Sequence, residues 1–205
     1  MNRKQEIKVL EKLFDKTLKL ISLYKKHDLT IPFALKGNLG EFIVTIELLK
    51  RFPDRQIDYK GGAFPGIDVS IDDVKMQVKT QFKQKPKKYG WGEFDYEGSP
   101  TIKKDAIDKK KYDILVLIIL YLNNSCSKIE KQNIYIFKGK EFKYFNTIGC
   151  WSGNSKGDYT IKNILSVNGE PSGSIKKEID FYNTPRYKKL FKQSKGAWSK
   201  IQDLI

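Results

Sequence analysis

The longest apolar run in the chain, Ile114 to Leu122, constrains its fold more than any other feature of the sequence. A membrane-spanning helix needs about 20 apolar residues, so this run is far too short to cross a bilayer. Its length suits a strand that is buried in a sheet. Helical patterns occur near both ends of the chain, and we therefore expect an α/β domain with a restriction-endonuclease-like mixed central β-sheet flanked by helices.

Two helices are expected before the sheet. Apolar side chains recur at three- and four-residue intervals from Ile7 to Tyr24, which predicts a long amphipathic helix. After an irregular stretch at 29–37, a second helix is expected from about Leu39 to Arg51, and Pro53 ends it.

The remaining segments have a β-like texture for most of their length. Strands are expected at 56–59, 67–71 and 74–82, a glycine-rich loop at 83–100, one or two helical turns at 101–111, a hairpin from 133–137 and 141–145, a weaker strand at 159–167, and a helix at 185–205 with a break near Gly196. The 205 residues suit one domain, 1–205, with N-terminal helices at 3–51, the main sheet region at 56–122 and C-terminal strands and a helix at 133–205.

The charge balance favours nucleic acid as the partner. The chain has 39 Lys and Arg against 24 Asp and Glu, a formal net charge of +15, and polyphosphate commonly binds such proteins. A lysine-rich proteome would give the same count. The single histidine, His27, gives little support to a histidine base or a histidine-rich metal site.

The cysteines and the N-terminus bear on location. Cys126 and Cys150 are too far apart in the sequence to indicate a disulfide framework or a zinc site. Residues 1–6 lack the apolar stretch of a signal peptide. We expect a cytoplasmic protein without a membrane partner.

The stretch from Ile67 to Thr80 places polar groups together. If Asp72-Asp73 is a two-residue turn, the apolar side chains pair across the hairpin and form one face. The predicted pairs are Ile71 with Val74, Val69 with Met76 and Ile67 with Val78. The same register sets Asp68 opposite Gln77 on the other face, with Lys79 one step further along, opposite Gly66.

These groups can support phosphodiester hydrolysis, which needs a hard divalent cation, an activated water and positive charge near the developing anion. Asp68 supplies a carboxylate, Gln77 an amide oxygen and Val78 a backbone carbonyl as metal ligands, and Lys79 can orient the water or stabilise charge. One negative charge is few for Mg²⁺, so a second acid is expected. Glu41, placed at the first turn of the second helix, is the best candidate, although an acid there could equally serve the helix dipole.

Gly40-Glu41 on a helix, Gly66-Ile67-Asp68 and Gln77-Val78-Lys79-Thr80 together resemble the PD-(D/E)XK nuclease superfamily. The resemblance covers roughly residues 37–122. It implies metal and catalytic roles for Glu41, Asp68, Gln77 and Lys79, with Mg²⁺ as cofactor and Mn²⁺ as a substitute. Pro65 lies three positions before Asp68 rather than next to it, and Gln77 replaces the usual acid, a variant that occurs among restriction enzymes of this family.

Other readings of these residues stay open. Asp68, Gln77 and Lys79 could simply face solvent on a strand, Asp72 could be only a turn residue, and Asp58 is a spare carboxylate.

Lysines and aromatic residues alternate directly after this strand. Lysines can contact phosphates while aromatics stack on bases, so we expect DNA contacts here, unless this is a surface loop whose aromatics cover the core edge. The candidate residues are Lys83, Lys85, Lys87, Lys88, Tyr89 and Trp91. A second basic cluster comprises Arg186, Lys188, Lys189, Lys192, Lys195 and Lys200, which could also be merely solvated.

The function expected from the sequence is a Mg²⁺-dependent endonuclease for double-stranded DNA. A homodimeric type II restriction endonuclease is favoured. A junction resolvase, a repair nuclease and a non-catalytic DNA-binding protein with the same fold are the alternatives.

Overall fold

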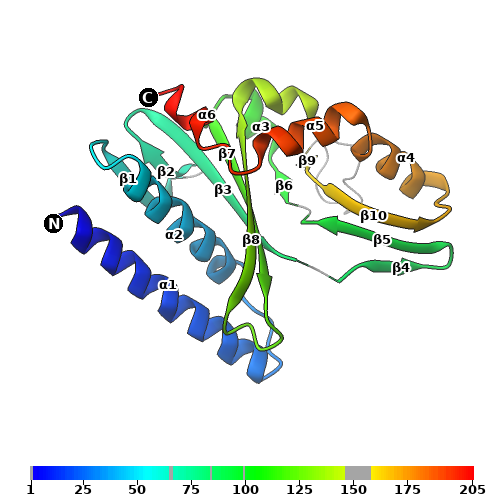
Figure 1. The fold of residues 1–205 in the computed structure, drawn as a ribbon, viewed down its shortest axis with the longest axis horizontal. Coiled ribbons are helices and arrows are strands. Elements are labelled where there is room, and N and C mark those ends of the chain that lie inside the picture. The colour runs from blue at the N-terminus through cyan, green and yellow to red at the C-terminus, as the bar shows by residue number, and fades with distance from the viewer. Residues whose placement is uncertain (1, 65–66, 84, 99, 146–157) are drawn as a thin grey trace.

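A computed structural model describes residues 2–64, 67–83, 85–98, 100–145 and 158–205 (Figure 1). A five-stranded sheet in the order β1-β2-β3-β7-β8 forms its centre. The strands are β1 (Ile57–Phe64), β2 (Ile67–Ile71), β3 (Val74–Phe82), β7 (Ile114–Leu122) and β8 (Ile129–Lys138). β3 and β7 run parallel, and the other neighbouring pairs are antiparallel. The predicted α/β class with a mixed central sheet is therefore confirmed.

β7 is buried on both faces of this sheet. Ile114, Val116 and Ile118 belong to one core cluster, and Leu115 and Leu117 belong to a second cluster. Successive side chains of a strand point to opposite faces, so β7 contributes to both cores. The prediction of a buried strand here is confirmed. Among the described residues, no helix is long and apolar enough to span a membrane.

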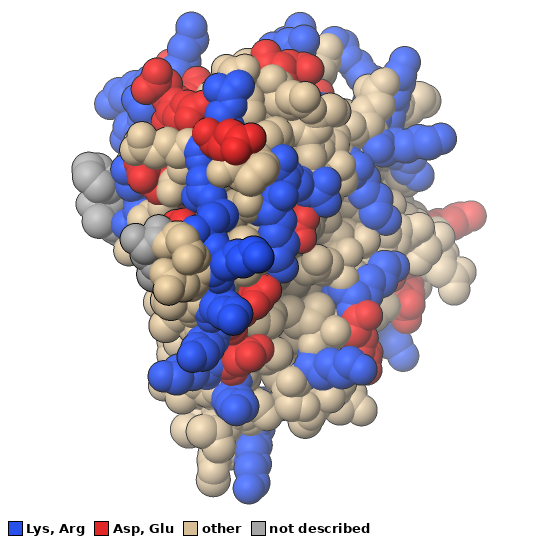
Figure 2. Space-filling model, turned by 60° about the vertical axis from the view of Figure 1, so that its left-hand side comes forward, with Lys and Arg blue, Asp and Glu red and all other residues tan. Residues whose placement is uncertain are grey.

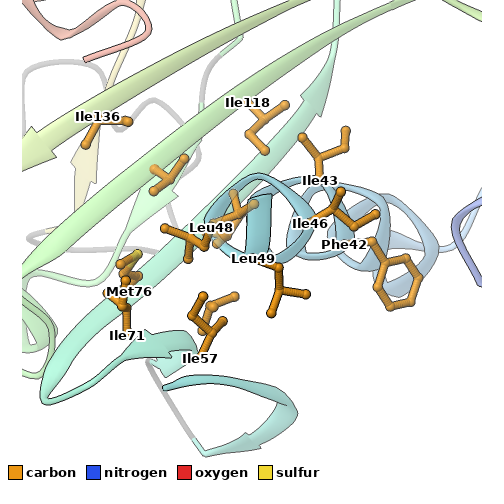
Figure 3. Close-up of a cluster of buried hydrophobic side chains, with 14 of the residues drawn as sticks. Phe42, Ile43, Ile46, Leu48, Leu49, Ile57, Ile71, Met76, Ile118 and Ile136 are labelled. Carbon is orange, nitrogen blue, oxygen red and sulfur yellow. The ribbon is translucent and has the colours of Figure 1, made fainter. Parts of the chain in front are cut away.

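α2 (Phe33–Arg51) covers one face of the sheet, and α1 (Arg3–Lys26) packs on the outer side of α2 (Figure 1). Apolar side chains of α2 lie in one cluster with a side chain from each of the five strands (Figure 3). The labelled partners are Ile57, Ile71, Met76, Ile118 and Ile136. Burial of this α2 face accounts for the position of the helix on the sheet.

The predicted start of the second helix is wrong by six residues, because α2 begins at Phe33 and not at Leu39. Pro32 precedes the first turn in an extended conformation, which suits a helix start. Leu35 and Leu39 pack on the core, and this contact outweighs the weak helix propensity of Gly37.

A second layer covers the other face. It contains a three-stranded sheet in the order β10-β5-β4 and the helices α4 and α5 (Figure 1). The bounds of the elements in this part are β4 (Lys87–Tyr89), β5 (Gly92–Glu97), β6 (Thr101–Ile102), α3 (Lys104–Asp108), η1 (Gly139–Tyr144), β9 (Tyr159–Thr160), β10 (Asn163–Gly169), α4 (Gly173–Tyr182), α5 (Pro185–Ser194) and α6 (Ser199–Gln202).

Several sequence predictions fail in this layer. The loop expected at 83–100 contains the β4–β5 hairpin, because Phe94 and Tyr96 on β5 are buried in the second core. The hairpin expected at 133–145 is wrong: β8 pairs with β7, and 139–144 is a 3₁₀ helix in which the Glu141 side chain accepts a 2.7 Å hydrogen bond from Lys138 N. α4 was not predicted. The helix break near Gly196 is confirmed, and the residue has a left-handed φ of 60°.

Candidate metal centre

The candidate site lies where β2 and β3 separate. The ladder contains the predicted pairs Ile71–Val74 and Val69–Met76, so the predicted register and two-residue turn are confirmed. Asp72 supplies the left-handed turn conformation, with a φ of 49°. Among the described residues the ladder ends at Val69–Met76, and the predicted pair of Ile67 with Val78 is not formed.

Beyond the end of the backbone ladder, the carboxylate of Asp68 accepts the hydrogen bonds that link β2 to β3. Val78 N donates a 2.7 Å hydrogen bond to Asp68 Oδ2, and the Gln77 side-chain amide donates to the same oxygen. Gln77 Nε2 also lies 3.5 Å from the Val78 carbonyl oxygen. Asp68 and Gln77 are both buried, at 9% and 8% exposure. They are therefore fixed parts of the fold and not solvent-facing strand residues. Gly66, expected opposite Lys79, lies outside the described residues.

Glu41 reaches this site from α2. Gly40 lets the helix lie directly against β3, since an added Cβ would overlap the Thr80 hydroxyl. Glu41 is about two turns into the helix. The expected place at the first turn is therefore wrong, and the helix dipole does not account for an acid at this position.

The charges of Glu41, Asp68 and Lys79 act on one another. Burial, followed by the negative charge of Asp68, raises the pKa of Glu41, while a hydrogen bond from the Tyr59 hydroxyl and the charge of Lys79 oppose the rise. Burial also raises the pKa of Asp68, against the opposing effects of the Val78 N–H, Lys79 and Gln77. The four predicted catalytic residues thus meet in one place.

Sequence reasoning missed Tyr59, which interacts with Glu41. Burial and the nearby Glu41 carboxylate raise the pKa of Tyr59 to about 12, so the phenol is a hydrogen-bond donor at neutral pH. Its ring lies 5.6 Å from that of Phe42 on α2. Alternation along β1 was a usable signal, because it sets Tyr59 on the same face as the buried Ile57.

A divalent cation fits the chemistry of this cluster. Glu41 Oε2 and Thr80 Oγ1 are buried without a hydrogen-bond partner, which is unfavourable for a carboxylate oxygen. Two carboxylates, an amide and a backbone carbonyl are the oxygen donors that Mg²⁺ prefers. The described residues contain no group of three or more His, Cys, Asp or Glu in a metal-binding arrangement. A cation here would therefore also need the neutral oxygens of Gln77 and Val78.

The other carboxylates considered from the sequence lie outside this cluster. Asp72 accepts hydrogen bonds from Arg55 and from Gln56 N, as expected of a turn residue. Asp58 pairs with Lys60 at 3.2 Å.

The expected DNA-binding segment is an arm and not a free loop. Lys83 pairs with Asp95 and donates a 2.9 Å hydrogen bond to the Tyr96 carbonyl. The rings of Tyr89 and Trp91 stack on each other at 5.1 Å and pack on the second core. The side chains of Lys85, Lys87 and Lys88 are exposed.

In the second basic cluster, Lys200 binds Glu141, while the remaining members are exposed. His27 lies at the exposed end of α1. Comparison of the chain with protein-family models, with curated proteins and with solved structures found no match.

Proposed function

We propose that this protein is a metal-dependent DNA endonuclease with a restriction-endonuclease-like arrangement of its sheet and helices. The observation that supports it most is the convergence of Glu41 from α2 with Asp68, Gln77 and Lys79 from the hairpin. These residues occur in the order and on the types of element that the resemblance to PD-(D/E)XK nucleases implies. The buried, unpartnered oxygen of Glu41 gives independent support.

Each residue of the cluster has a chemical task in this proposal. Asp68 Oδ2 is held by Val78 N and Gln77, which leaves Oδ1 for a cation. Glu41 Oε2 supplies the second anionic ligand, and the carbonyl oxygens of Gln77 and Val78 complete the protein's share. Gln77 must turn its amide oxygen inward for this, which exchanges the two ends of a nearly symmetric group and gives up its hydrogen bond to Asp68, so that Val78 N alone then holds Asp68 Oδ2.

A bound Mg²⁺ or Mn²⁺ would lower the pKa of a water molecule and stabilise negative charge on the phosphate. Lys79 carries the positive charge beside both carboxylates. In the proposed reaction the Lys79 ammonium holds the attacking water in line with the phosphorus atom and donates a hydrogen bond to a non-bridging phosphate oxygen.

Double-stranded DNA is the proposed substrate. The net charge is +15, and Lys and Arg side chains form a band across the face in Figure 2, with Asp and Glu scattered along it. Lysine contacts with phosphates would provide affinity that falls with salt. A homodimeric restriction enzyme that acts in the cytoplasm is the favoured biology, and a junction resolvase or repair nuclease is the alternative.

The test is cleavage of supercoiled plasmid with Mg²⁺ or Mn²⁺, comparing wild type with Lys79→Ala and Lys75→Ala. Both lysines lie on β3, four residues apart and therefore on the same face of the strand. Lys75 is exposed and lies next to the Asp72-Asp73 turn. Loss of Lys79 should slow cleavage by about 10²-fold or more, whereas the Lys75 variant should retain the wild-type rate. Equal rates in the two variants, or no metal-dependent cutting of plasmid or four-way junctions by wild type, would contradict the proposal.

The neutral Gln77 favours a second candidate, a non-catalytic DNA-binding protein with this fold. Wild type would then bind duplex DNA without cutting it, and Gln77→Glu, which adds a carboxylate beside Asp68, would be needed for any cleavage. Cutting by wild type excludes this candidate.

A further inference from the structure

Phe33, the first residue of α2, is the most exposed large apolar side chain among the described residues, at 87%. Isolated apolar side chains on a surface are ordinary. The position of Phe33 distinguishes it from the others, because it lies beside the end of the strand that carries the candidate catalytic residues.

Lys36 connects Phe33 to that strand. Its Nζ is 5.3 Å from the centre of the Phe33 ring and 5.4 Å from the centre of the Phe82 ring. Phe82 is the last residue of β3, three residues after Lys79. At about 3.3 Å per residue, the end of β3 lies roughly 10 Å from Lys79.

A similar distance separates Phe33 from Glu41 along α2. Phe33, Gly37 and Glu41 are spaced four residues apart, so they lie along one ridge of the helix. Eight residues at 1.5 Å each separate Phe33 from Glu41 by about 12 Å. Gly37 has no side chain between them, and a Cβ there would approach Glu41 Oε1 to 3.6 Å. No side chain of this ridge therefore lies between the exposed ring and Glu41.

Lysines accompany Phe33 at this end of the molecule. The end of α1, the start of α2 and the tip of the β7–β8 hairpin lie side by side (Figure 1), and a 3.0 Å hydrogen bond from Ser22 Oγ to the Ser125 carbonyl joins α1 to the hairpin. Burial raises the pKa of the Cys126 thiol at this tip, while the charges of Lys25 and Lys36 oppose the rise, so both cations act on this tip. Asp28 is the only acidic residue from Lys25 to Lys36.

An exposed aromatic ring beside a lysine side chain suits a polyanion that also carries flat apolar groups. We propose that Phe33 stacks on, or wedges between, bases of the bound DNA while Lys36 contacts the adjoining phosphate. This inference rests on the proposed nuclease function. At 3.4 Å per base step, the contact lies about three base steps from the bond that is cut.

The test compares Phe33→Ala and Phe33→Trp with Leu13→Ala, a control at another exposed apolar residue, on α1 at 41% exposure. Binding of a short labelled duplex is measured in the Lys79→Ala background, in which cutting should be slow. Loss of the ring should weaken binding about 5- to 100-fold, the effect of one lost stacking contact, and tryptophan should retain the wild-type affinity. Leu13→Ala should bind as tightly as the parent protein. Mn²⁺ binding, followed by calorimetry, should be the same in all variants.

A base analogue locates the contact. Once the cut position has been mapped, 2-aminopurine placed three steps away should change its fluorescence when the parent protein binds, and Phe33→Ala should abolish this change. Equal duplex affinity of Phe33→Ala and Leu13→Ala would overturn the inference while leaving the nuclease proposal intact. A change in sedimentation of Phe33→Ala without DNA, at unchanged duplex affinity, would instead assign the ring to a protein contact. A wild type that neither binds nor cuts DNA would overturn both proposals.

Discussion

Replacing Gly40 with alanine should displace α2 from the sheet and thereby disturb the candidate metal centre. An ideal Cβ at this position overlaps the Thr80 hydroxyl and lies 2.9 Å from Thr80 Cβ and 3.1 Å from its Cγ2. Rotation of the threonine side chain relieves the contacts with Oγ1 and Cγ2 but leaves the distance between the two Cβ atoms unchanged. Cβ contacts in proteins are ordinarily 3.4 Å or longer, so helix and strand must separate by about 0.5 Å or more.

Two opposing terms set the expected stability of Gly40→Ala. Alanine improves helix propensity by about 1 kcal/mol over glycine. Forcing extra volume into a packed contact destabilises by about 1–3 kcal/mol. The net result should be a loss of roughly 0–2 kcal/mol in the free energy of unfolding. Because Glu41 follows Gly40 directly, the displacement should also reduce cleavage by tens of fold, given that about 1 Å of misplacement costs on the order of 10²-fold.

Gly37→Ala is the matched stability control on the same helix. Its Cβ would meet only Glu41 Oε1, at an ordinary 3.6 Å, so the propensity gain should stand alone and raise stability by about 0.5–1 kcal/mol. Urea denaturation without metal measures both variants. Mn²⁺ calorimetry and plasmid cleavage compare Gly40→Ala with wild type. If Gly40→Ala were as stable as Gly37→Ala and bound Mn²⁺ like wild type, the close approach of α2 to β3 would not position Glu41.

Two further substitutions test the buried carboxylates by urea denaturation across pH. Burial raises the pKa of both Asp68 and Glu41, so the metal-free protein should gain stability as the pH falls through these raised pKa values. Asp68→Asn should be about 0.5–2 kcal/mol more stable than wild type at pH 7 and should lose Mn²⁺ binding. A less stable Asp68→Asn variant would contradict the electrostatic argument. The pKa of Glu97 shifts in the opposite direction, because hydrogen bonds to its carboxylate outweigh the effect of burial and lower the pKa. The donors are Tyr121, Tyr135, Asn163 and Asn133. The stability that the Glu97 carboxylate contributes should be lost as the pH falls below 4.5, the ordinary pKa of this side chain. Glu97→Gln should remove this loss of stability in acid and should cost about 2–4 kcal/mol at pH 7. An unchanged dependence of stability on acid pH would show that the network does not stabilise the anion.

The part of the site that could be predicted from the sequence is the hairpin. Its alternation of polar and apolar residues has a period of two, and the turn residues Asp72 and Asp73 fix the register. A slip of one residue would turn every apolar side chain of the hairpin to the opposite face. The pairing of Val69 with Met76 and the proximity of Asp68 to Gln77 follow from these local features.

The contribution of α2 depends on contacts that no local pattern contains. The sequence indicates Glu41 as second acid only through its place in the chain and the family resemblance, and the predicted first-turn position is wrong. The helix starts earlier because Leu35 and Leu39 pack on the sheet. Likewise, the β4–β5 hairpin and the 3₁₀ helix after β8 form because distant residues pack on or bind them, among them Lys200, which binds Glu141.

The environment of Gln77 gives a physical reason for a neutral residue at this position. A glutamate there would place a third buried carboxylate against Asp68 and Glu41, whose pKa values are already raised. The amide of Gln77 instead donates a hydrogen bond to Asp68 and favours its charged form. This lowers the electrostatic penalty of the metal-free protein at the expense of one anionic ligand. Under the proposed function, Gln77 therefore suits a centre that folds before it binds a cation and holds that cation weakly, with the DNA phosphate supplying the remaining negative charge.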